Sequence, residues 1–152
     1  PQTERIDFSR LAVSEAFSFE SVAFEKGLVL NQNIENSIYV DGNSTQLKQI
    51  VSILLDNAIR HSKERGEVRL TLTKEHGFAK LSVINKADEI PEEERTKIFE
   101  RFYRVDAARN GEDKHYGLGL AIAKAIVTTH KGKISVRCYD GFVEFSVLIP
   151  SL

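Results

Sequence analysis

Apolar residues recur between residues 44 and 61 with the spacing of one face of a helix. After Asn43 and Ser44, they follow the i, i+3, i+4, i+7 pattern over three turns. The stripe consists of Leu47, Ile50, Val51, Leu54, Leu55, Ala58 and Ile59. Such a stripe packs against a core while the rest of the helix stays in water. The pattern therefore predicts an amphipathic helix.

Two other segments are predicted as long helices. The first covers residues 10–26, with Ser9 as its N-cap and Gly27 as its terminator. A serine hydroxyl can accept from the first free N–H groups of a helix, and glycine tolerates the left-handed conformation that ends one. The second helix covers residues 117–130 and ends at Gly132.

Short segments that alternate between apolar and polar residues predict strands. The predicted strands cover residues 28–34, 37–40, 68–73, 79–83, 133–138 and 142–149. Asp140 and Gly141 join the last two segments, and this pair of residues favours a tight hairpin turn.

The order of these elements predicts an α+β fold. Pro91 begins a short acidic helix over residues 92–98, while residues 100–116 have the polar, glycine-interrupted composition of a mobile loop. Helices on one face of a mixed, mainly antiparallel sheet would form a two-layer sandwich. A chain of 152 residues is expected to fold as one domain, residues 1–152, around a single core.

Charge and composition exclude several classes of partner. The net charge is −1, from 21 basic and 22 acidic residues, so no general attraction to nucleic acid or to an anionic membrane follows. No apolar run approaches the roughly 20 residues of a membrane span, and direct membrane contact is not expected. Cys138 is the only cysteine, which excludes an intramolecular disulfide and indicates a small buried residue.

Two glycines precede the predicted helix at residues 117–130. Gly117 and Gly119 would let backbone N–H groups approach an anion at the helix N-terminus, where the helix dipole favours phosphate. The spacing matches neither a P-loop nor a dinucleotide fingerprint, since Ile122 occupies the third glycine position. Alone, the pair supports phosphate binding and ordinary loop-to-helix packing equally.

A second candidate lies on the amphipathic helix. Asn57 falls beside the apolar stripe, so its carboxamide is expected to be half-buried at the edge of the core. The oxygen of an asparagine is a hard, neutral ligand that suits Mg²⁺ bound to phosphates. Arg60 follows one turn later, within reach of a phosphate oxygen. The alternative is a solvated helix face on which Asn57 bonds to the backbone.

Aromatic and basic residues interleave over Ile98-Phe99-Glu100-Arg101-Phe102-Tyr103-Arg104. Phenylalanines could anchor the following loop while an arginine points at a transferring phosphate. A basic and aromatic patch is also typical of sites for single-stranded nucleic acid. Acidic residues argue against that alternative at Asp88, Glu89, Glu92, Glu93, Glu94 and Glu100.

Taken in order, the asparagine, phenylalanine and glycine segments resemble the catalytic domain of sensor histidine kinases. These kinases belong to the superfamily of the gyrase, Hsp90 and MutL ATP-binding domains, whose fold is the Bergerat sandwich. The resemblance covers nearly the whole chain through LLDNAIRHS, IPEEERTKIFERFYRVDAAR and YGLGLAIAKAIVTTHKGKISV. The FYR sequence favours the kinases over gyrase, Hsp90 and MutL.

The resemblance implies an ATP-dependent protein-histidine kinase that uses ATP and Mg²⁺. It identifies Asn57 as the Mg²⁺ ligand, Asn85 as the residue for the adenine amino group, and residues 100–116 as an ATP lid. Asn57 and Arg104 are the implied catalytic residues, with Arg104 near the γ-phosphate. The implied nucleotide-binding set is Asn57, Arg60, His61, Asn85, Ile90, Phe99, Tyr103, Arg104, Tyr116, Gly117, Leu118, Gly119 and Leu120.

Some residues depart from the family pattern. The usual Asp-x-Gly-x-Gly reads Asn85-Lys86-Ala87-Asp88-Glu89, Ile53 stands where many relatives carry another asparagine, and His115-Tyr116 precede Gly117 where Gly-Thr or Gly-Ser is common. The altered stretch Asn85–Glu89 supports a first alternative, a degenerate pseudokinase with weak nucleotide binding. A second alternative is an interaction module with an empty pocket. A third is a protein-serine kinase of the anti-sigma type, which shares the superfamily but usually lacks FERFYR.

None of the four histidines begins the family's phosphoacceptor pattern, so the acceptor histidine is expected outside this fragment. The implied partners are the parent chain's own dimerisation and phosphoacceptor helices and a response regulator. The fragment is expected to be monomeric and the parent homodimeric. The resemblance further implies a cytoplasmic domain whose parent is anchored in the bacterial membrane.

Overall fold

A five-stranded mixed sheet forms one layer of the protein. The structure is a computed structural model that describes residues 3–63, 65–105, 114–115 and 118–152. The strands are β1 (Glu4–Asp7), β2 (Leu28–Ile34), β3 (Tyr39–Gly42), β4 (Gly66–Glu75), β5 (Phe78–Lys86), β6 (Arg104–Val105), β7 (Lys114–His115), β8 (Lys133–Tyr139) and β9 (Phe142–Pro150). The large sheet has the order β2-β4-β5-β9-β8. Only its β2–β4 pair is parallel.

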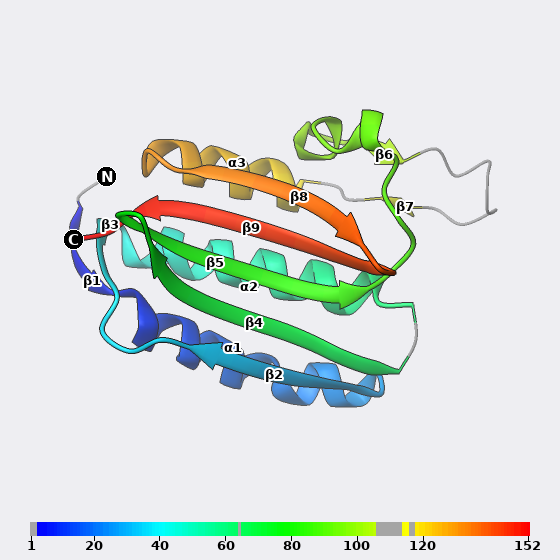
Figure 1. The fold of residues 1–152 in the computed structure, drawn as a ribbon, viewed down its shortest axis with the longest axis horizontal. Coiled ribbons are helices and arrows are strands. Elements are labelled where there is room, and N and C mark those ends of the chain that lie inside the picture. The colour runs from blue at the N-terminus through cyan, green and yellow to red at the C-terminus, as the bar shows by residue number, and fades with distance from the viewer. Residues whose placement is uncertain (1–2, 64, 106–113, 116–117) are drawn as a thin grey trace.

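Helices cover one face of this sheet, as predicted. They are α1 (Phe8–Glu25), α2 (Ser44–His61) and α3 (Gly119–Thr129), and they lie behind the strands in Figure 1. The two-layer α+β sandwich expected from the sequence is therefore confirmed. β1 and β3 form a separate antiparallel pair at the end of the molecule where α2 begins.

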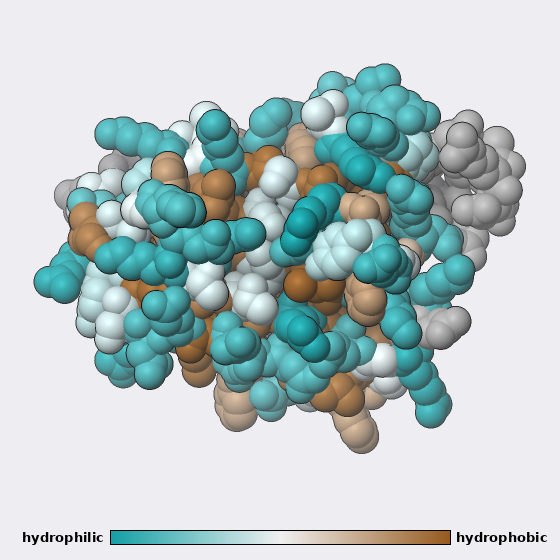
Figure 2. Space-filling view, in the orientation of Figure 1, coloured by the Kyte–Doolittle hydropathy of each residue, from teal (hydrophilic) through white to brown (hydrophobic). Residues whose placement is uncertain are grey.

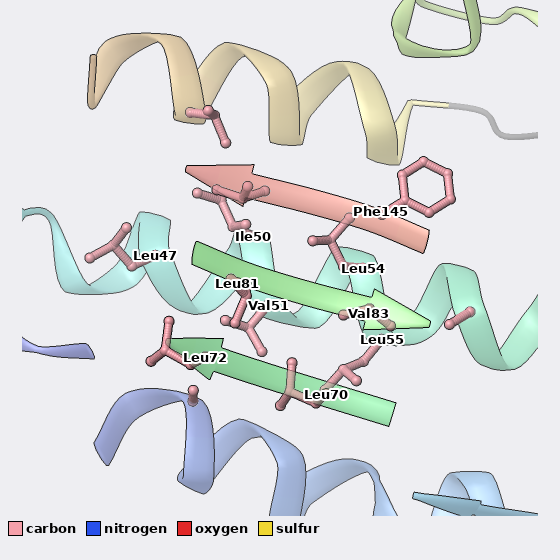
Figure 3. Close-up of a cluster of buried hydrophobic side chains, with 14 of the residues drawn as sticks. Leu47, Ile50, Val51, Leu54, Leu55, Leu70, Leu72, Leu81, Val83 and Phe145 are labelled. Carbon is pink, nitrogen blue, oxygen red and sulfur yellow. The ribbon is translucent and has the colours of Figure 1, made fainter. Parts of the chain in front are cut away.

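The core lies between α2 and the central strands. Figure 3 shows the apolar stripe of α2 facing side chains from β4, β5 and β9. Leu47, Ile50, Leu54 and Leu55 are all fully buried. Burial of this many large aliphatic groups stabilises the layer contact and fixes the orientation of α2. The orientation matters because α2 also carries Asn57.

The cap of α1 differs from the prediction. Asp7 occupies the N-cap position, and its carboxylate accepts a hydrogen bond from the Arg10 N–H. Ser9 is buried instead, with its hydroxyl donating to the Glu35 carbonyl and accepting from the Ile38 N–H. Ser9 was the wrong N-cap because tertiary contacts take its hydroxyl away from the helix end.

The acidic segment after Pro91 is also not the single helix that was predicted. It forms two 3-10 turns, η1 (Glu92–Glu94) and η2 (Lys97–Phe99). The side chains of η1 are not buried, whereas Ile98 and Phe99 of η2 are. A short segment with apolar residues at only one end has no continuous face to pack as an α-helix.

The predicted loop 100–116 includes a short strand pair, in which β6 runs antiparallel to β7. Residues 106–113 and 116 of the predicted mobile loop lie outside the described residues. None of the helices in the described ranges combines the length and apolar character that crossing a membrane requires.

The face of the sheet opposite the helices is open, and Figure 2 shows polar and apolar side chains mixed across it. Glu144 is nevertheless buried there, on β9. Its carboxylate accepts hydrogen bonds from Arg137 Nε at 2.8 Å and from the Tyr139 hydroxyl at 3.0 Å. Burial raises the pKa of Glu144, but these hydrogen bonds outweigh burial and hold the pKa below its usual value.

Candidate functional site

The candidate residues gather at the end of the molecule where α2 and β5 finish and α3 begins. Figure 1 shows these three ends together, next to η1, η2 and the β6–β7 pair. α3 contacts both α2 and η2. The Lys63 N–H donates to the Lys86 carbonyl at 3.0 Å, which ties the segment after α2 to the end of β5. The topology thus brings together segments that are far apart in sequence.

Asn57 lies on α2 beside the apolar stripe. Its side chain is 8% exposed, and its carboxamide forms no hydrogen bond with another described residue. A buried amide usually has a protein partner, because an unpaired one costs about 1–3 kcal/mol. The Asn57 oxygen is therefore available to a ligand. A hard, neutral oxygen of this kind fits Mg²⁺, which keeps few protein ligands when it is bound to phosphates.

Asn85 lies near the end of β5, with a side chain that is 2% exposed. It shares its strand parity with Ala79, Leu81 and Val83, so its side chain is on the helix-covered side of the sheet. Its Nδ2 donates to the Lys86 carbonyl at 3.3 Å. This arrangement leaves Oδ1 as an acceptor without a donor among the described residues.

The N-terminus of α3 has no side-chain cap among the described residues, since Leu118 occupies the N-cap position. Asp7 and Asn43 cap α1 and α2, so this helix start is the exception. The first N–H groups of a helix have no partner within the helix. At α3 they remain available to an anion, and the helix dipole favours phosphate there.

Gly119, the first residue of α3, is not required by packing. A Cβ atom built on it would lie 3.4 Å from Ile53 Cγ2, an ordinary contact, and its φ is not in the left-handed region. Gly132 is different, because a Cβ there would lie 2.1 Å from the Leu148 carbonyl oxygen. Nothing in the described protein explains a glycine at residue 119. A glycine is the residue that would let a ligand approach the backbone closely at this position.

Aromatic and apolar residues form the adjoining wall. Phe99 packs edge-to-face on Phe145 with ring centroids 6.1 Å apart, and the Tyr103 hydroxyl donates to Glu94. Ile90 is buried, and its carbonyl accepts from Arg95 Nε at 2.9 Å. These contacts fix the segment between β5 and β6 beside the start of α3.

Comparison with known families identifies the family of the chain. The model of the family described as "Histidine kinase-, DNA gyrase B-, and HSP90-like ATPase" matches residues 42–151. The chain belongs to this ATPase family. The matched range begins just before α2 and includes every candidate residue of the site.

Individual relatives are sensor kinases. The sensor protein DltS of Streptococcus agalactiae serotype III (strain NEM316) is 38% identical over 147 residues, which cover 97% of this chain and 37% of DltS. A nucleotide-free catalytic domain of the histidine kinase ThkA has a TM-score of 0.86 at 26% identity, covering 99% of this chain and 97% of that domain. The ATPase domain thus has the fold of a histidine kinase catalytic domain.

Another solved structure contains ThkA in complex with the response regulator protein TrrA. It matches with a TM-score of 0.82 at 26% identity, covering 99% of this chain and 42% of the ThkA chain. The chain spans little more than a third of the length of DltS.

The other residues predicted to bind the nucleotide differ in exposure and in their contacts. Arg60 is more than half exposed and forms an ion pair with Asp56 at 2.7 Å. His61 is partly exposed at the end of α2, while Leu118 is 38% exposed and Leu120 is buried. The Arg104 backbone belongs to β6, and its side chain is outside the described residues, as are Tyr116 and Gly117.

Ile53 also borders the candidate site, although the sequence analysis noted it only because many relatives have an asparagine at this position. It lies one turn before Asn57, is partly buried against the core and faces Gly119 across the α2–α3 contact. An asparagine there could offer another polar group to a ligand, whereas isoleucine offers an apolar contact. Its spacing of four residues from Asn57 was the available signal, because such residues share a helix face.

Protein side chains alone do not form a metal site in the described ranges, where no group of three or more His, Cys, Asp and Glu residues is suitably placed. A cavity of about 400 Å³ lies at the opposite end of the molecule, lined by residues that include Asp41, Gln46, His130 and Lys131. None of the predicted site residues lines it.

Proposed function

We propose that this domain binds ATP with Mg²⁺ and positions the γ-phosphate for transfer to a histidine of the parent sensor kinase. The observation that carries the proposal is the start of α3, where the helix has no side-chain cap and Gly119 has no packing reason to be glycine. Free N–H groups and an approachable backbone are what a polyphosphate needs at a helix N-terminus.

The other residues complete the proposed site. The Asn57 oxygen is a ligand for Mg²⁺, and the Asn85 oxygen accepts from the adenine amino group. The N–H groups at Gly117 and Gly119 hold phosphate oxygens, while Arg104 stabilises the γ-phosphate during transfer. Tyr103 and Leu118 would offer aromatic and apolar surface to the nucleotide, with the buried Ile90, Phe99 and Leu120 packed behind that surface. His61 and Tyr116 complete the proposed nucleotide-binding set. Arg60 reaches the phosphates only if its side chain leaves Asp56.

Positioning and charge neutralisation would accelerate the transfer, without a covalent intermediate on this domain. The proposed acceptor is a histidine on the dimerisation helices of a homodimeric parent. A response regulator would receive the phosphoryl group next, a role supported by the ThkA complex with TrrA. We place the domain on the cytoplasmic side of a membrane-anchored parent. Nothing in the comparisons favours the degenerate, non-binding alternative.

Calorimetric titration of the chain with ATP, with and without Mg²⁺, tests the binding step. We expect saturable binding that is tighter with Mg²⁺ than with EDTA. GTP serves as the matched control for the base. A dissociation constant of about 1 mM corresponds to a binding free energy of roughly −4 kcal/mol. If ATP does not bind even at about this concentration, the proposed function is ruled out.

The transfer step is tested in the full-length parent. Wild-type parent should incorporate the γ-phosphate of ATP into an acid-labile phosphohistidine, and the Asn57→Ala parent should not. A Val22→Ser parent is the control, since Val22 lies on α1, away from the site. If the Asn57→Ala parent phosphorylates at the wild-type rate, Asn57 has no role in the reaction.

A further inference from the structure

The segment that follows Asn85 leaves the sheet before the chain reaches η1. Asn85 itself is held in β5, where it pairs with Val68 on β4 and with Val143 on β9. The strand ends at Lys86, and residues 87–91 have no regular secondary structure. In Figure 1 this stretch rises from the end of β5 toward η1 and η2, beside the start of α3. It is therefore a part of the proposed nucleotide site that the sheet does not fix.

A backbone hydrogen bond holds the beginning of this segment, where the Ala87 N–H donates to the Gly141 carbonyl at 3.2 Å. Further along, the backbone of residues 89 and 90 forms no hydrogen bond with another backbone group of the described residues. Buried backbone groups need a partner in a folded protein, because an unpaired one costs free energy. In this segment the partner comes from a side chain.

The Arg95 side chain supplies that partner. η1 turns the chain back, and the Arg95 N–H donates to the Glu92 carbonyl at 3.2 Å, which places the Arg95 guanidinium next to the preceding segment. Its Nε donates to the Ile90 carbonyl at 2.9 Å, and its Nη2 lies 2.9 Å from Glu89 Oε1. The Arg95 side chain is only 22% exposed. One arginine thus holds two consecutive residues of the segment.

The two contacts of Arg95 differ in strength. The Glu89 side chain is 73% exposed, and water screens an ion pair with so exposed a carboxylate. Ile90 is buried, and its carbonyl accepts from a charged donor, which forms a stronger hydrogen bond than a neutral one. Removing the donor would leave a buried acceptor without this bond. The contact with the Ile90 carbonyl is therefore the one expected to hold the segment.

We propose that Arg95 is a positioning residue for the nucleotide base, an inference that rests on the proposed function. Arg95 acts through residues 89 and 90, which it fixes relative to the Asn85 carboxamide that accepts from the adenine amino group. An arginine suits this role because its planar fork bonds to the carbonyl and the carboxylate together, whereas a lysine offers a single ammonium group. The phosphate contacts at the start of α3 do not depend on Arg95.

Arg95→Met tests the inference, because methionine keeps an unbranched side chain and has no N–H donor. Calorimetry measures the dissociation constants for ATP and for CTP, both with Mg²⁺. CTP keeps the ribose and the triphosphate and replaces the purine by a pyrimidine. We expect wild type to prefer ATP. Arg95→Met should bind ATP about fivefold more weakly, while its affinity for CTP stays within about twofold of wild type.

Two matched variants identify the contact that matters, and melting temperatures verify that each variant folds. Glu89→Gln removes the exposed charge and leaves the Ile90 carbonyl bonded, so its affinity for ATP should stay within about twofold of wild type. Arg95→Lys keeps a charged donor and should recover part of the lost affinity. In the empty chain, the amide order parameters of residues 89 and 90 should fall below the value of rigid backbone, about 0.85, in Arg95→Met alone.

Affinity of Arg95→Met for ATP within about twofold of wild type would overturn the inference. An equal loss for ATP and CTP would overturn it by showing a general effect on the site, and an equal loss in Glu89→Gln would assign the effect to the exposed ion pair instead. Equal wild-type affinity for ATP and CTP would show that the base is not recognised, with triphosphate binding intact. Absence of ATP binding by wild type is the separate failure of the proposed function. Order parameters that Arg95→Met leaves unchanged would overturn the inference in either case.

Discussion

The two ends of α2 use the same residue type in opposite ways. At its start, Asn43 is occupied by the protein: its side chain accepts from the Gln46 N–H at 2.9 Å, and its N–H donates to His130 Nε2 at 3.1 Å. His130 Nδ1 in turn donates to the Ile126 carbonyl at 2.8 Å. At the other end, the Asn57 carboxamide has no such partner among the described residues.

Glycines follow the same division. Gly42 and Gly132 lie at the occupied end, where a Cβ atom would lie within 2.8 Å of the His130 ring or of the Leu148 carbonyl oxygen. Gly119 lies at the open end, where a Cβ atom would meet only an ordinary contact. Polar and glycine residues at the occupied end stabilise the fold. At the other end, the fold gives no structural reason for the Asn57 carboxamide or for a glycine at residue 119. Residues that the fold does not need are the ones expected to bind a ligand.

The largest expected effect is on stability and comes from Gly132→Ala. Its new methyl group would collide with the Leu148 carbonyl oxygen, so the backbone of β9 or the end of α3 must move. We expect a loss of about 3 kcal/mol in the free energy of unfolding, measured by urea denaturation. A stability equal to that of wild type would contradict the packing role given to this glycine.

Asn57→Ala should separate binding from stability. Alanine favours the helix interior and no protein hydrogen bond is lost, so the melting temperature should hardly change. The dissociation constant for Mg-ATP should rise by about tenfold or more, since a charge-assisted contact contributes roughly 1.5–3 kcal/mol. Asn43→Ala is the matched control. It should destabilise by about 1 kcal/mol through loss of the α2 cap and leave the dissociation constant unchanged.

Gly119→Ala sharpens the contrast between the two glycines. The added methyl group is accommodated beside Ile53, and the melting temperature should stay level or rise slightly, because alanine favours a helix over glycine. Affinity for ATP should fall by several-fold to about tenfold, as the methyl group holds phosphate away from the N–H groups. A large loss of stability would mean that Gly119 is required by the fold.

Glu144 is a hydrogen-bonded polar group on the face of the sheet opposite the helices and Asn85, so its removal should affect stability alone. Because its folded-state pKa is lowered, its stabilising contribution is present above the ordinary carboxyl pKa and is lost as pH falls through the folded-state value. Wild type should therefore melt higher than Glu144→Gln at pH 7, by about 1 kcal/mol in stability. The difference should shrink progressively under acid. A gap independent of pH would contradict this.

Asn85→Asp gives the smallest expected change. A carboxylate can only accept, so it should tighten ATP binding and increase the preference for ATP over GTP. The substitution also buries a negative charge and removes the Nδ2 donor that bonds to the Lys86 carbonyl. Both effects destabilise the protein, so its melting temperature without nucleotide should fall. We expect an affinity gain of only about threefold. Stronger binding of GTP than of ATP by this variant would show that residue 85 does not contact the base.

The sequence predicted the elements whose pattern is local. The stripe of α2, the hairpin of β4 and β5 and the Asp140-Gly141 turn each depend on residues close in the chain. Ser9 and Asp7 are both good N-caps, and distant contacts with Glu35 and Ile38 decided between them. β1 escaped prediction because its four residues include only one buried side chain, Ile6. At the candidate site, the sequence motifs were enough to name the residues. They could not predict the ion pair between Arg60 and Asp56 or the contact between Ile53 and Gly119, because both depend on how the side chains pack.

A backbone amide chemical-shift map of the chain, recorded as ATP and Mg²⁺ are added, tests the difference between the two ends of α2 most directly. We predict the largest shifts at Asn57, Asn85 and the start of α3, and almost none at Asn43, Gln46 and His130. A cavity of about 400 Å³ lies beside Asn43, Gln46 and His130, so nucleotide binding at the start of α2 is the alternative that this experiment tests. Shifts concentrated around Asn43 and His130, with none near Asn57 and Gly119, would contradict the account.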